Sequence, residues 1–339
     1  MLYMSSSMRC IPDPGGPAPS RIAVVAVGGN ALTAEGQQGT ADQILANAAV
    51  MAGCLAGLAA EGWQLAVVHG NGPQVGALSM QQDAARHEVP AQPMHDLCAM
   101  TQGQLGSVLV RSLDALLGGG RAVAVVTHVA VDLADPGFGD PTKPIGPFFT
   151  QARAQKLAQE RGWHVREDSG RGWRRVVPSP QPGHVVELGA VRTLIAAGHV
   201  VLAAGGGGVA VAEQPDGSLL GVDAVVDKDL AAAALASSLG ATDLYLLTGV
   251  ANVLLDFGTA EQRPVHSMTA REAEGHLADG QFPPGSMGPK VEAALRFLQA
   301  GGTRAIITSA ELLAEAAAGT PGIGTEIVPV PGDVASVAS

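Results

Sequence analysis

Lysine is scarce in this 339-residue chain, with four lysines against sixteen arginines, and three of the four stand in turn-like sequence. Lys143 lies in PTKPIGP, Lys228 in VVDKDL and Lys290 in PGSMGPKVEAAL, whereas Lys156 lies in an ordinary helical stretch. A lysine supplies a compact, strongly hydrated point charge, whereas arginine supplies a planar fork. Phosphoryl transfer uses charges of the first kind, because its catalysis is mostly positioning and charge neutralisation. The alternative interpretation is that four residual lysines occupy these positions by chance.

Two of these lysines stand where helices are expected to begin. Lys228 lies between Asp227 and Asp229, ahead of an alanine-rich stretch, and Asp227 is a suitable N-cap residue. Lys290 follows a Gly-Pro pair that marks another helix start. Because the helix dipole disfavours a cation at this end, each lysine is expected to face an anionic partner. Together the two lysines would form the arms of a phosphate clamp.

The elements that must position these lysines alternate between strands and helices. Alternation of this kind predicts an α/β protein, a three-layer αβα sandwich with a mainly parallel central sheet. The composition agrees, because 47% hydrophobic with only 3% aromatic residues suits helices packed closely on a parallel sheet. Strands are expected at residues 21–27, 64–69, 122–132, 199–204, 244–248, 304–308 and 325–329, and helices at 41–61, 74–86, 94–117, 150–161, 186–197, 228–239, 269–279, 289–300 and 310–318.

The length of the chain predicts two lobes rather than one core. We expect an N-terminal lobe at 21–212 and a C-terminal lobe at 213–329, flanked by flexible tails at 1–20 and 330–339. The segment 133–184 interrupts the regular alternation with many Pro and Gly residues, one helix and a hairpin around WHVREDSGRGWRRVVPS. We therefore expect this segment to form a small subdomain that protrudes from the main sheet.

Three of the predicted strands end in glycine clusters, at residues 28–30, 70–73 and 205–208. Glycine lets backbone N–H groups approach an anion, and the dipole of a following helix adds to the attraction. Ligands of open α/β sheets bind beyond the carboxyl ends of the strands. One such cluster could be purely structural, but three of them at the strand ends of one sheet favour a face that binds anions.

Composition excludes several classes of protein. A formal net charge of -11 argues against a nucleic-acid surface, which needs a basic footprint. Cys10, Cys54 and Cys98 are too few and too scattered for a disulfide framework or a zinc site, and are expected to be reduced thiols in a cytoplasmic protein. The sequence contains no apolar run near the roughly 20 residues that span a bilayer. The first twenty residues lack the apolar region of a signal peptide.

The common nucleotide-binding motifs are missing or incomplete. A Walker A loop needs Gly-Lys followed by Ser or Thr, and the chain contains no Gly-Lys pair. GGGGVA at 205–210 formally fits a dinucleotide fingerprint, but AEQPDGSL follows where a helix is required. His69 could contact a ligand, although a hydrogen-bonded histidine at a strand end is the simpler interpretation.

Eight sequence blocks together resemble the carbamate kinases, within the amino-acid-kinase fold family. They extend over nearly the whole chain from Arg21 to Val328, and DPTKPIGPFF and GRGWRRVVPSP are the most specific of them. The resemblance implies the αβα fold, a homodimer, an N-terminal lobe that binds carbamate or carbamoyl phosphate, and a C-terminal lobe that binds ATP or ADP with Mg²⁺. The remaining blocks are AVGGNAL, HGNGPQVG, AMTQGQLG, AGGGGVAV, GVDAVVDKDLA and PPGSMGPKVEAAL.

The same resemblance implies roles for individual residues. Lys143 would be brought onto the substrate by the protruding subdomain, Lys228 and Lys290 would contact the phosphates, and Asp229 would orient these two lysines. No protein residue would bind the metal directly, because Mg²⁺ would be carried by the nucleotide. A carbamate oxygen is already anionic, so no general base is needed. The substrate would be held by backbone groups of Gly28, Gly29, Asn30, Gly70 and Asn71, and the nucleotide by Gly206, Gly207, Thr248, Met287 and Gly288.

Several alternatives stay open at this point. A related kinase of the same fold could phosphorylate another small carboxylate or UMP, a dinucleotide-binding oxidoreductase could use GGGGVA, and a non-catalytic relative could only bind the ligands. Arg171, Arg174 and Arg175 could shield phosphate or could be solvated hairpin residues. The segment 253–265 is atypical of the family and leaves details of the nucleotide pocket open. The working direction, expected to be ATP formation in arginine or purine breakdown, is not readable from the residues.

Overall fold

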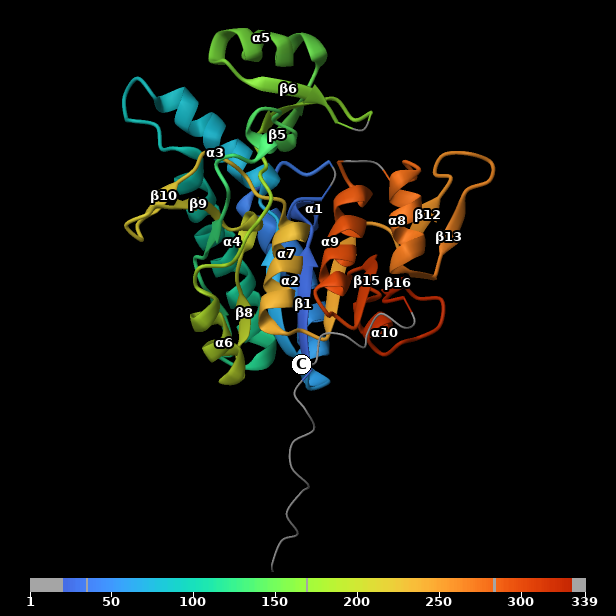
Figure 1. Cartoon of the computed structure of the whole chain (residues 1–339). Coiled ribbons are helices and arrows are strands. Elements are labelled where there is room, and N and C mark those ends of the chain that lie inside the picture. Colours follow the sequence, from blue (N-terminus) through green and yellow to red (C-terminus); the bar gives the residue numbers. More distant parts are fainter. Residues whose placement is uncertain (1–20, 35, 169, 283–284, 331–339) are drawn as a thin grey trace, which may run out of the picture.

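The computed structural model describes residues 21–34, 36–168, 170–282 and 285–330, with the backbone alone at Asn30 (Figure 1). The predicted tail at 1–20 lies outside the described residues, as does the second tail except for residue 330. The described helices are α1 (Gly29–Leu32), α2 (Ala41–Ala60), α3 (Gly72–Ala85), α4 (Met94–Leu117), α5 (Gln151–Arg161), α6 (Leu188–Ala196), α7 (Lys228–Leu239), α8 (Ala270–Ala278), α9 (Met287–Gln299) and α10 (Leu313–Ala317).

In the described part of the chain, the main sheet has eight strands in the order β14-β16-β15-β11-β1-β2-β8-β3. Neighbouring strands pair in parallel except β15 and β16, so the sheet is mainly parallel as predicted. These strands are β1 (Ile22–Val27), β2 (Gln64–His69), β3 (Ala122–Ala124), β8 (Val200–Leu202), β11 (Asp243–Thr248), β14 (Ser267–Thr269), β15 (Arg304–Ser309) and β16 (Thr325–Val328).

Alternate side chains of the central strands enter two separate cores, one on each face of the sheet. Val24 and Ala26 of β1 pack with apolar residues of α6, α7 and α9, whereas Val25 and Val27 pack with residues of α2, α4 and α10. Alternation follows from the strand period of two. The predicted three-layer αβα fold is therefore confirmed, with β1 buried between both helical layers.

One predicted strand is wrong in its extent. The run 122–132 divides into β3, which joins the main sheet, and β4 (His128–Ala130), which pairs with β9 (Val209–Glu213) in a smaller sheet with β10 (Leu219–Gly221). The chain changes sheet between these strands, where Gln102 of α4 binds the backbone of Thr127. Because every residue of the run suits a strand, only the tertiary partner reveals the break.

The glycine run at 205–208 is not followed by a helix. It forms the 3₁₀ turn η2 (Gly205–Gly207) and continues directly into β9. A dinucleotide fingerprint requires a helix N-terminus at this point, so the oxidoreductase alternative loses its structural basis. The predicted division between lobes at 212/213 falls inside the β9–β10 hairpin, and the division itself stays a prediction.

The protruding subdomain consists of α5 and a three-stranded sheet with the order β5-β7-β6. Its strands are β5 (Lys143–Phe149), β6 (His164–Glu167) and β7 (Trp173–Val177), and it stands beyond one end of the main sheet (Figure 1). It contacts α3 through two glycines, since a Cβ atom on Gly76 would lie 2.0 Å from the backbone nitrogen of Gly146. This close approach fixes β5, and with it Lys143, relative to the main body.

Helix α2 corrects one sequence-based expectation, because by length and composition it could cross a membrane. In the structure one face of α2 packs on the sheet, with Met51, Leu55 and Leu58 buried in the core. A capping box at Thr40 and Gln43 starts the helix. These contacts are those of a core helix.

A short hairpin precedes α8 in the C-terminal half of the chain. Strands β12 (Val253–Leu255) and β13 (Arg263–Val265) pair as an antiparallel hairpin. This hairpin contains the atypical segment 253–265, which the sequence did not resolve into strands. It stands beside α8 at the outer side of the C-terminal half (Figure 1).

Candidate functional site

A cavity of about 700 Å³ opens at the carboxyl ends of β1, β2 and β11. Strand β1 lies between β2 and β11. The strands β2, β3 and β8 lie on one side of β1 in the sheet, whereas β11, β14, β15 and β16 lie on the other side. Such a switch point leaves a crevice where ligands of α/β proteins bind. The cavity is lined by most of the predicted site residues: Gly28, Gly29, Gly70, Asn71, Lys143, Gly206, Lys228, Asp229, Thr248, Met287 and Lys290.

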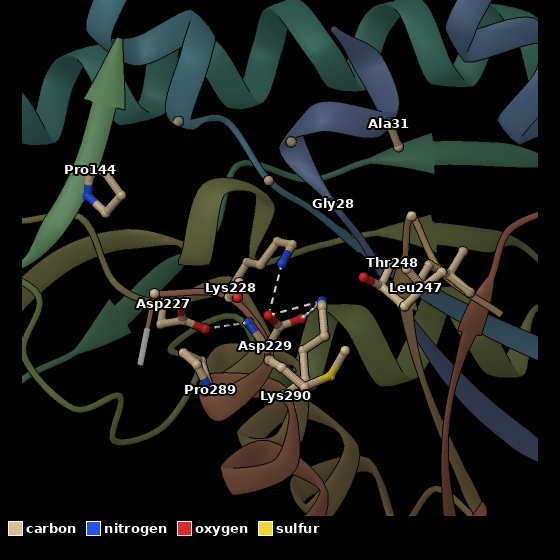
Figure 2. A pocket seen from close by; sticks show the side chains of 18 of the residues that line it. Gly28, Ala31, Pro144, Asp227, Lys228, Asp229, Leu247, Thr248, Pro289 and Lys290 are labelled. Carbon is tan, nitrogen blue, oxygen red and sulfur yellow. Dashed lines mark hydrogen bonds and ion pairs between the residues drawn. The ribbon is translucent and has the colours of Figure 1, made fainter. Parts of the chain in front are cut away.

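Lys228 and Lys290 converge on one carboxylate from two helix N-termini. The Nζ atom of Lys228 lies 2.9 Å from Asp229 Oδ2, and Nζ of Lys290 lies 3.1 Å from Oδ1 and 3.2 Å from Oδ2 (Figure 2). Lys290 is 7% exposed and Asp229 3% exposed. The sequence predicted both helix starts, and the structure joins them at a single aspartate.

The protonation states in this cluster follow from burial and charge. Burial, together with the positive Lys228, lowers the pKa of Lys290 to about 8, although Asp229 acts in the opposite direction. Burial also acts to lower the pKa of Lys228, but attraction to Asp229 and Asp227 exceeds it, and that pKa is raised. Burial acts to raise the pKa of Asp229, yet both lysines hold it below its usual range. Lys290 is therefore the lysine that loses its proton first.

Asp227 connects the protruding subdomain to this cluster. Its Oδ1 atom accepts hydrogen bonds from the backbone N–H groups of Asp229 and Leu230 and so caps α7, as the sequence predicted. Its Oδ2 atom lies 2.5 Å from Nζ of Lys143 on β5. Burial acts to raise the pKa of Asp227, but attraction to Lys143 and Lys228 keeps it well below its usual range. The sequence predicts only the capping role of Asp227, because no local signal indicates its pairing with Lys143.

The glycine turns after β1 and β2 pack directly against each other at the cavity wall. A Cβ atom on Gly70 would lie 2.6 Å from the backbone nitrogen of Gly29 and 3.0 Å from Cδ of Lys228. A Cβ atom on Gly29 would lie 3.3 Å from the ring of Pro73. Side chains on these turns would fill the space that the backbone groups and Lys228 share. Glycine is therefore required here by close approach rather than by a turn angle.

Apart from that of α7, three helix N-termini at the cavity lack side-chain caps. The N-cap residues Gly28 of α1, Asn71 of α3 and Ser286 of α9 make no side-chain capping bond. The first N–H groups of a helix have no acceptor within the helix. Since these groups carry partial positive charge, they are suited to a bound anion. Asn30 lies in the first turn of α1, and its predicted role rests on its backbone.

Gly206 and Gly207 have contacts that differ from those expected of nucleotide ligands. A Cβ atom on Gly206 would lie 2.2 Å from Nδ2 of Asn71, and one on Gly207 would lie 2.1 Å from the carbonyl oxygen of Val226. Gly206 lines the cavity, and the turn η2 packs with β2, α4 and α7. Their contacts therefore connect both glycines to the β2 turn and to the start of α7.

The other side of the cavity is less polar. Thr248 ends β11 and Met287 begins α9, and both line the cavity, whereas Gly288 is buried in the first turn of α9. The sequence did not predict further lining residues of this side, which lie in or just before the β12–β13 hairpin or shortly after α8: Val250, Asn252, Leu254, Phe257, Gln281 and Phe282.

The hairpin arginines are not simply solvated residues. Arg174 is 9% exposed, donates to the carbonyl of Gly146 and to Asp168, and lines the cavity. Arg171 also lines the cavity and donates to Asp168 at 3.1 Å. Arg175 points elsewhere, to the hydroxyl of Ser79 at 2.7 Å. The interpretation as solvated residues is wrong for Arg174.

Comparison with known proteins identifies the family. The model of the Amino acid kinase family matches residues 21–309. A carbamate kinase of Pyrococcus horikoshii is 44% identical over 317 residues, covering 92% of this chain and 100% of the relative. A carbamate kinase of Trichomonas vaginalis is 42% identical over 312 residues, covering 90% and 99%.

Solved structures agree with this result. Carbamate kinase from Giardia lamblia bound to citric acid superposes with a TM-score of 0.87 at 37% identity, covering 92% of this chain and 99% of that one. The same enzyme bound to AMP-PNP gives a TM-score of 0.82 at 37% identity, with the same coverage. This chain belongs to the amino acid kinase family and, within it, to the carbamate kinases.

Proposed function

We propose that the cavity transfers a phosphoryl group reversibly between ATP and carbamate, and that the working direction is formation of ATP from ADP and carbamoyl phosphate. The observation that carries this proposal is the convergence of Lys228 and Lys290 on Asp229 at the switch point of the sheet. Two ammonium groups held by one buried carboxylate are fixed in place before any anion enters. Preorganised charges of this kind contribute most to phosphoryl transfer.

The substrate side is assigned to the facing glycine turns. Backbone N–H groups of Gly28, Gly29, Asn30, Gly70 and Asn71 would hold the carbamate and the transferring phosphoryl group, with Lys143 above them. A planar carbamate needs no proton removed before it attacks, so the site requires orientation and charge rather than a base. His69 fits this view, because burial lowers its pKa to about 4 and its Nδ1 lies 3.1 Å from the carbonyl oxygen of Gly70.

The nucleotide side is assigned to the less polar half of the cavity. Thr248, Met287 and Gly288 would lie near the nucleotide, with Lys228 and Lys290 on its phosphates. Gly206 and Gly207 were expected there too, but their contacts favour a role in shaping the β2 turn and the start of α7. We retain them as residues of the site whose effect on the nucleotide is indirect.

Mg²⁺ is proposed to enter with the nucleotide. Among the described residues no group of three or more His, Cys, Asp or Glu could hold a metal ion. Asp227 and Asp229 already accept hydrogen bonds from lysines. Because these two carboxylates are occupied by lysines, the site fits a metal ion carried by the nucleotide. Mg²⁺ would neutralise the charge of the nucleotide's phosphates there. A homodimer, a cytoplasmic location and a place in arginine or purine breakdown are further proposals that rest on the family resemblance.

The test is detection of ATP from ADP and carbamoyl phosphate with Mg²⁺, comparing the wild type with Lys290→Ala. We expect turnover in the wild type and a large loss in the variant. Turnover assays with ATP and other small carboxylates, or with ATP and UMP, test whether the protein is instead a related kinase with another acceptor. Preference for any of those acceptors, or equal turnover in both proteins, would contradict the proposal.

A further inference from the structure

The block AMTQGQLG of α4 takes no part in the chemistry described so far, yet its two central side chains are buried beside the cavity. Thr101 is 0% exposed and Gln102 is 4% exposed. Each of them hydrogen-bonds to a residue of another element rather than only to its own helix. A buried polar side chain in the middle of a helix needs such partners, so their identity is informative.

Thr101 binds the side chain of Asn71 at the start of α3. The Nδ2 atom of Asn71 donates to Oγ1 of Thr101 at 2.9 Å. The Thr101 hydroxyl itself donates within α4, to the carbonyl oxygens of Leu97 or Cys98 at 3.0 and 2.9 Å. The hydroxyl hydrogen of Thr101 is therefore donated to a carbonyl of α4, and the hydroxyl oxygen accepts the hydrogen bond from the Asn71 amide. The direction of this hydrogen bond is therefore fixed.

This bond removes Asn71 from the role that its position suggests. Asn71 is the N-cap residue of α3, where asparagine ordinarily accepts a hydrogen bond from the second or third N–H group of the helix. Pro73 has no N–H, so the only such target is Gln74. Because the Asn71 side chain is held by Thr101 instead, no side chain caps this helix. The N–H group of Gln74, which follows Gly72 and Pro73 of the cavity wall, is thereby left without a side-chain acceptor.

A second contact is made with the same amide group of Asn71. A Cβ atom on Gly206 would lie 2.2 Å from Nδ2 of Asn71, so the backbone of η2 packs directly against the amide. This turn is itself fixed from α4, since Gln102 binds both backbone groups of Thr127 at 3.0 Å. The hydroxyl of Thr127 in turn accepts a hydrogen bond from the backbone N–H of Ala204, the residue before η2, which has a φ of 49°. Adjacent residues of α4 thus support both contacts of Asn71.

We infer that Thr101 is a positioning residue for phosphoryl transfer, which acts by turning the Asn71 side chain away from the N-terminus of α3. Without its acceptor, the Asn71 amide is free to rotate and its oxygen to cap α3. The cap would occupy an N–H group at the end of the helix that the substrate approaches. The inference rests on the proposed function, since it assumes that carbamoyl phosphate binds at this turn.

The test compares Thr101→Val with Thr101→Ser. Valine has the shape of threonine but cannot accept the hydrogen bond, whereas serine keeps the hydroxyl and loses only a methyl group. For Thr101→Val we expect kcat/KM for carbamoyl phosphate to fall about tenfold, the scale of one unsatisfied buried donor. We expect its KM for ADP to stay within about twofold, because the nucleotide side is unchanged. Thr101→Ser should retain most of the activity.

A double-mutant cycle with Asn71→Ala separates positioning from a general structural effect. If Thr101 acts through Asn71, Thr101→Val should have almost no further effect in the Asn71→Ala protein. An additional tenfold loss there would overturn the inference. So would equal kcat/KM values for the valine and serine variants, or a parallel loss for ADP and carbamoyl phosphate together with a lower melting temperature.

Calorimetric titration with carbamoyl phosphate distinguishes this inference from the proposed function. A wild-type protein that forms no ATP would remove the proposed function. Weaker binding of carbamoyl phosphate by Thr101→Val than by Thr101→Ser would still support the positioning role. Equal binding by the two variants would overturn it, whatever the wild type does with ADP.

Discussion

Lys143 and Asp227 form an ion pair between the protruding subdomain and the start of α7, with 2.5 Å between Nζ and Oδ2. The pair is half-buried on the lysine side and largely buried on the aspartate side. Asp227 also caps the helix that carries Lys228 and Asp229. One carboxylate therefore sets both the position of Lys143 and the start of the helix beneath it.

Asp227→Asn separates these two roles. Asparagine caps a helix about as well as aspartate, but it has no charge to hold Lys143. We expect kcat/KM for carbamoyl phosphate to fall about tenfold, in the range measured for losing a charged hydrogen bond, while the melting temperature changes little. Enzyme kinetics and thermal unfolding measure the two effects.

The control is Asp42→Asn, the same change at an exposed position in the first turn of α2. It should leave turnover unchanged. If Asp227→Asn is as active as this control, Asp227 serves only as a cap and Lys143 does not depend on it.

Lys228→Ala and Lys290→Ala should each reduce kcat by about 10²–10³, the scale for losing one preorganised electrostatic group. The physical reason is that each ammonium group is already held by Asp229 and loses no order when the phosphates arrive. Lys156→Ala is the matched control, because Lys156 lies outside the cavity and forms an exposed pair with Glu160 at 3.6 Å. Steady-state turnover near the wild-type value in either cavity variant would rule out the clamp.

The lowered pKa of Lys290 predicts a pH limit. Since burial lowers this pKa to about 8, the free enzyme loses a positive charge in the cavity as the pH rises through that value. The kcat/KM for carbamoyl phosphate reports the free enzyme and should therefore fall above about pH 8. Lys290→Arg keeps its charge at higher pH, so its activity, although lower at neutral pH, should not show this decline. Identical profiles for the two proteins would assign the limit to another group.

Gly76→Ala should displace β5. The new Cβ atom would lie 2.0 Å from the backbone nitrogen of Gly146, and neither backbone can move without disturbing the subdomain. We expect a loss of about 1–3 kcal/mol in the free energy of unfolding, as for other overpacked contacts. Because Lys143 begins β5, kcat/KM should fall as well.

Gly57→Ala in α2 provides the comparison for this substitution. A Cβ atom at Gly57 would meet nothing within 4 Å. The higher helix propensity of alanine should stabilise the protein there by up to about 1 kcal/mol. Chemical denaturation of both variants decides the point, and a Gly76→Ala protein as stable as Gly57→Ala would show that β5 is not tightly packed on α3.

The sequence determined the local parts of this protein. Hydrophobic periodicity located the long helices and the strands of the main sheet except β14, because a core on each face of the sheet requires those patterns. It also indicated that Asp227 caps α7 and that Lys228 and Lys290 stand at helix starts, since caps and Gly-Pro pairs are local signals. The family resemblance then supplied the activity, with which the relatives agree.

Tertiary structure alone decided which of these parts meet. Lys290 and Asp229 are 61 positions apart, and Lys143 and Asp227 are 84 apart, so no local pattern connects them. The division of the 122–132 run between two sheets likewise depends on a partner from a distant segment, because β4 pairs with β9. The physical reason is that an isolated segment carries its own propensity and periodicity, whereas a contact between segments exists only after the chain has closed the loop between them.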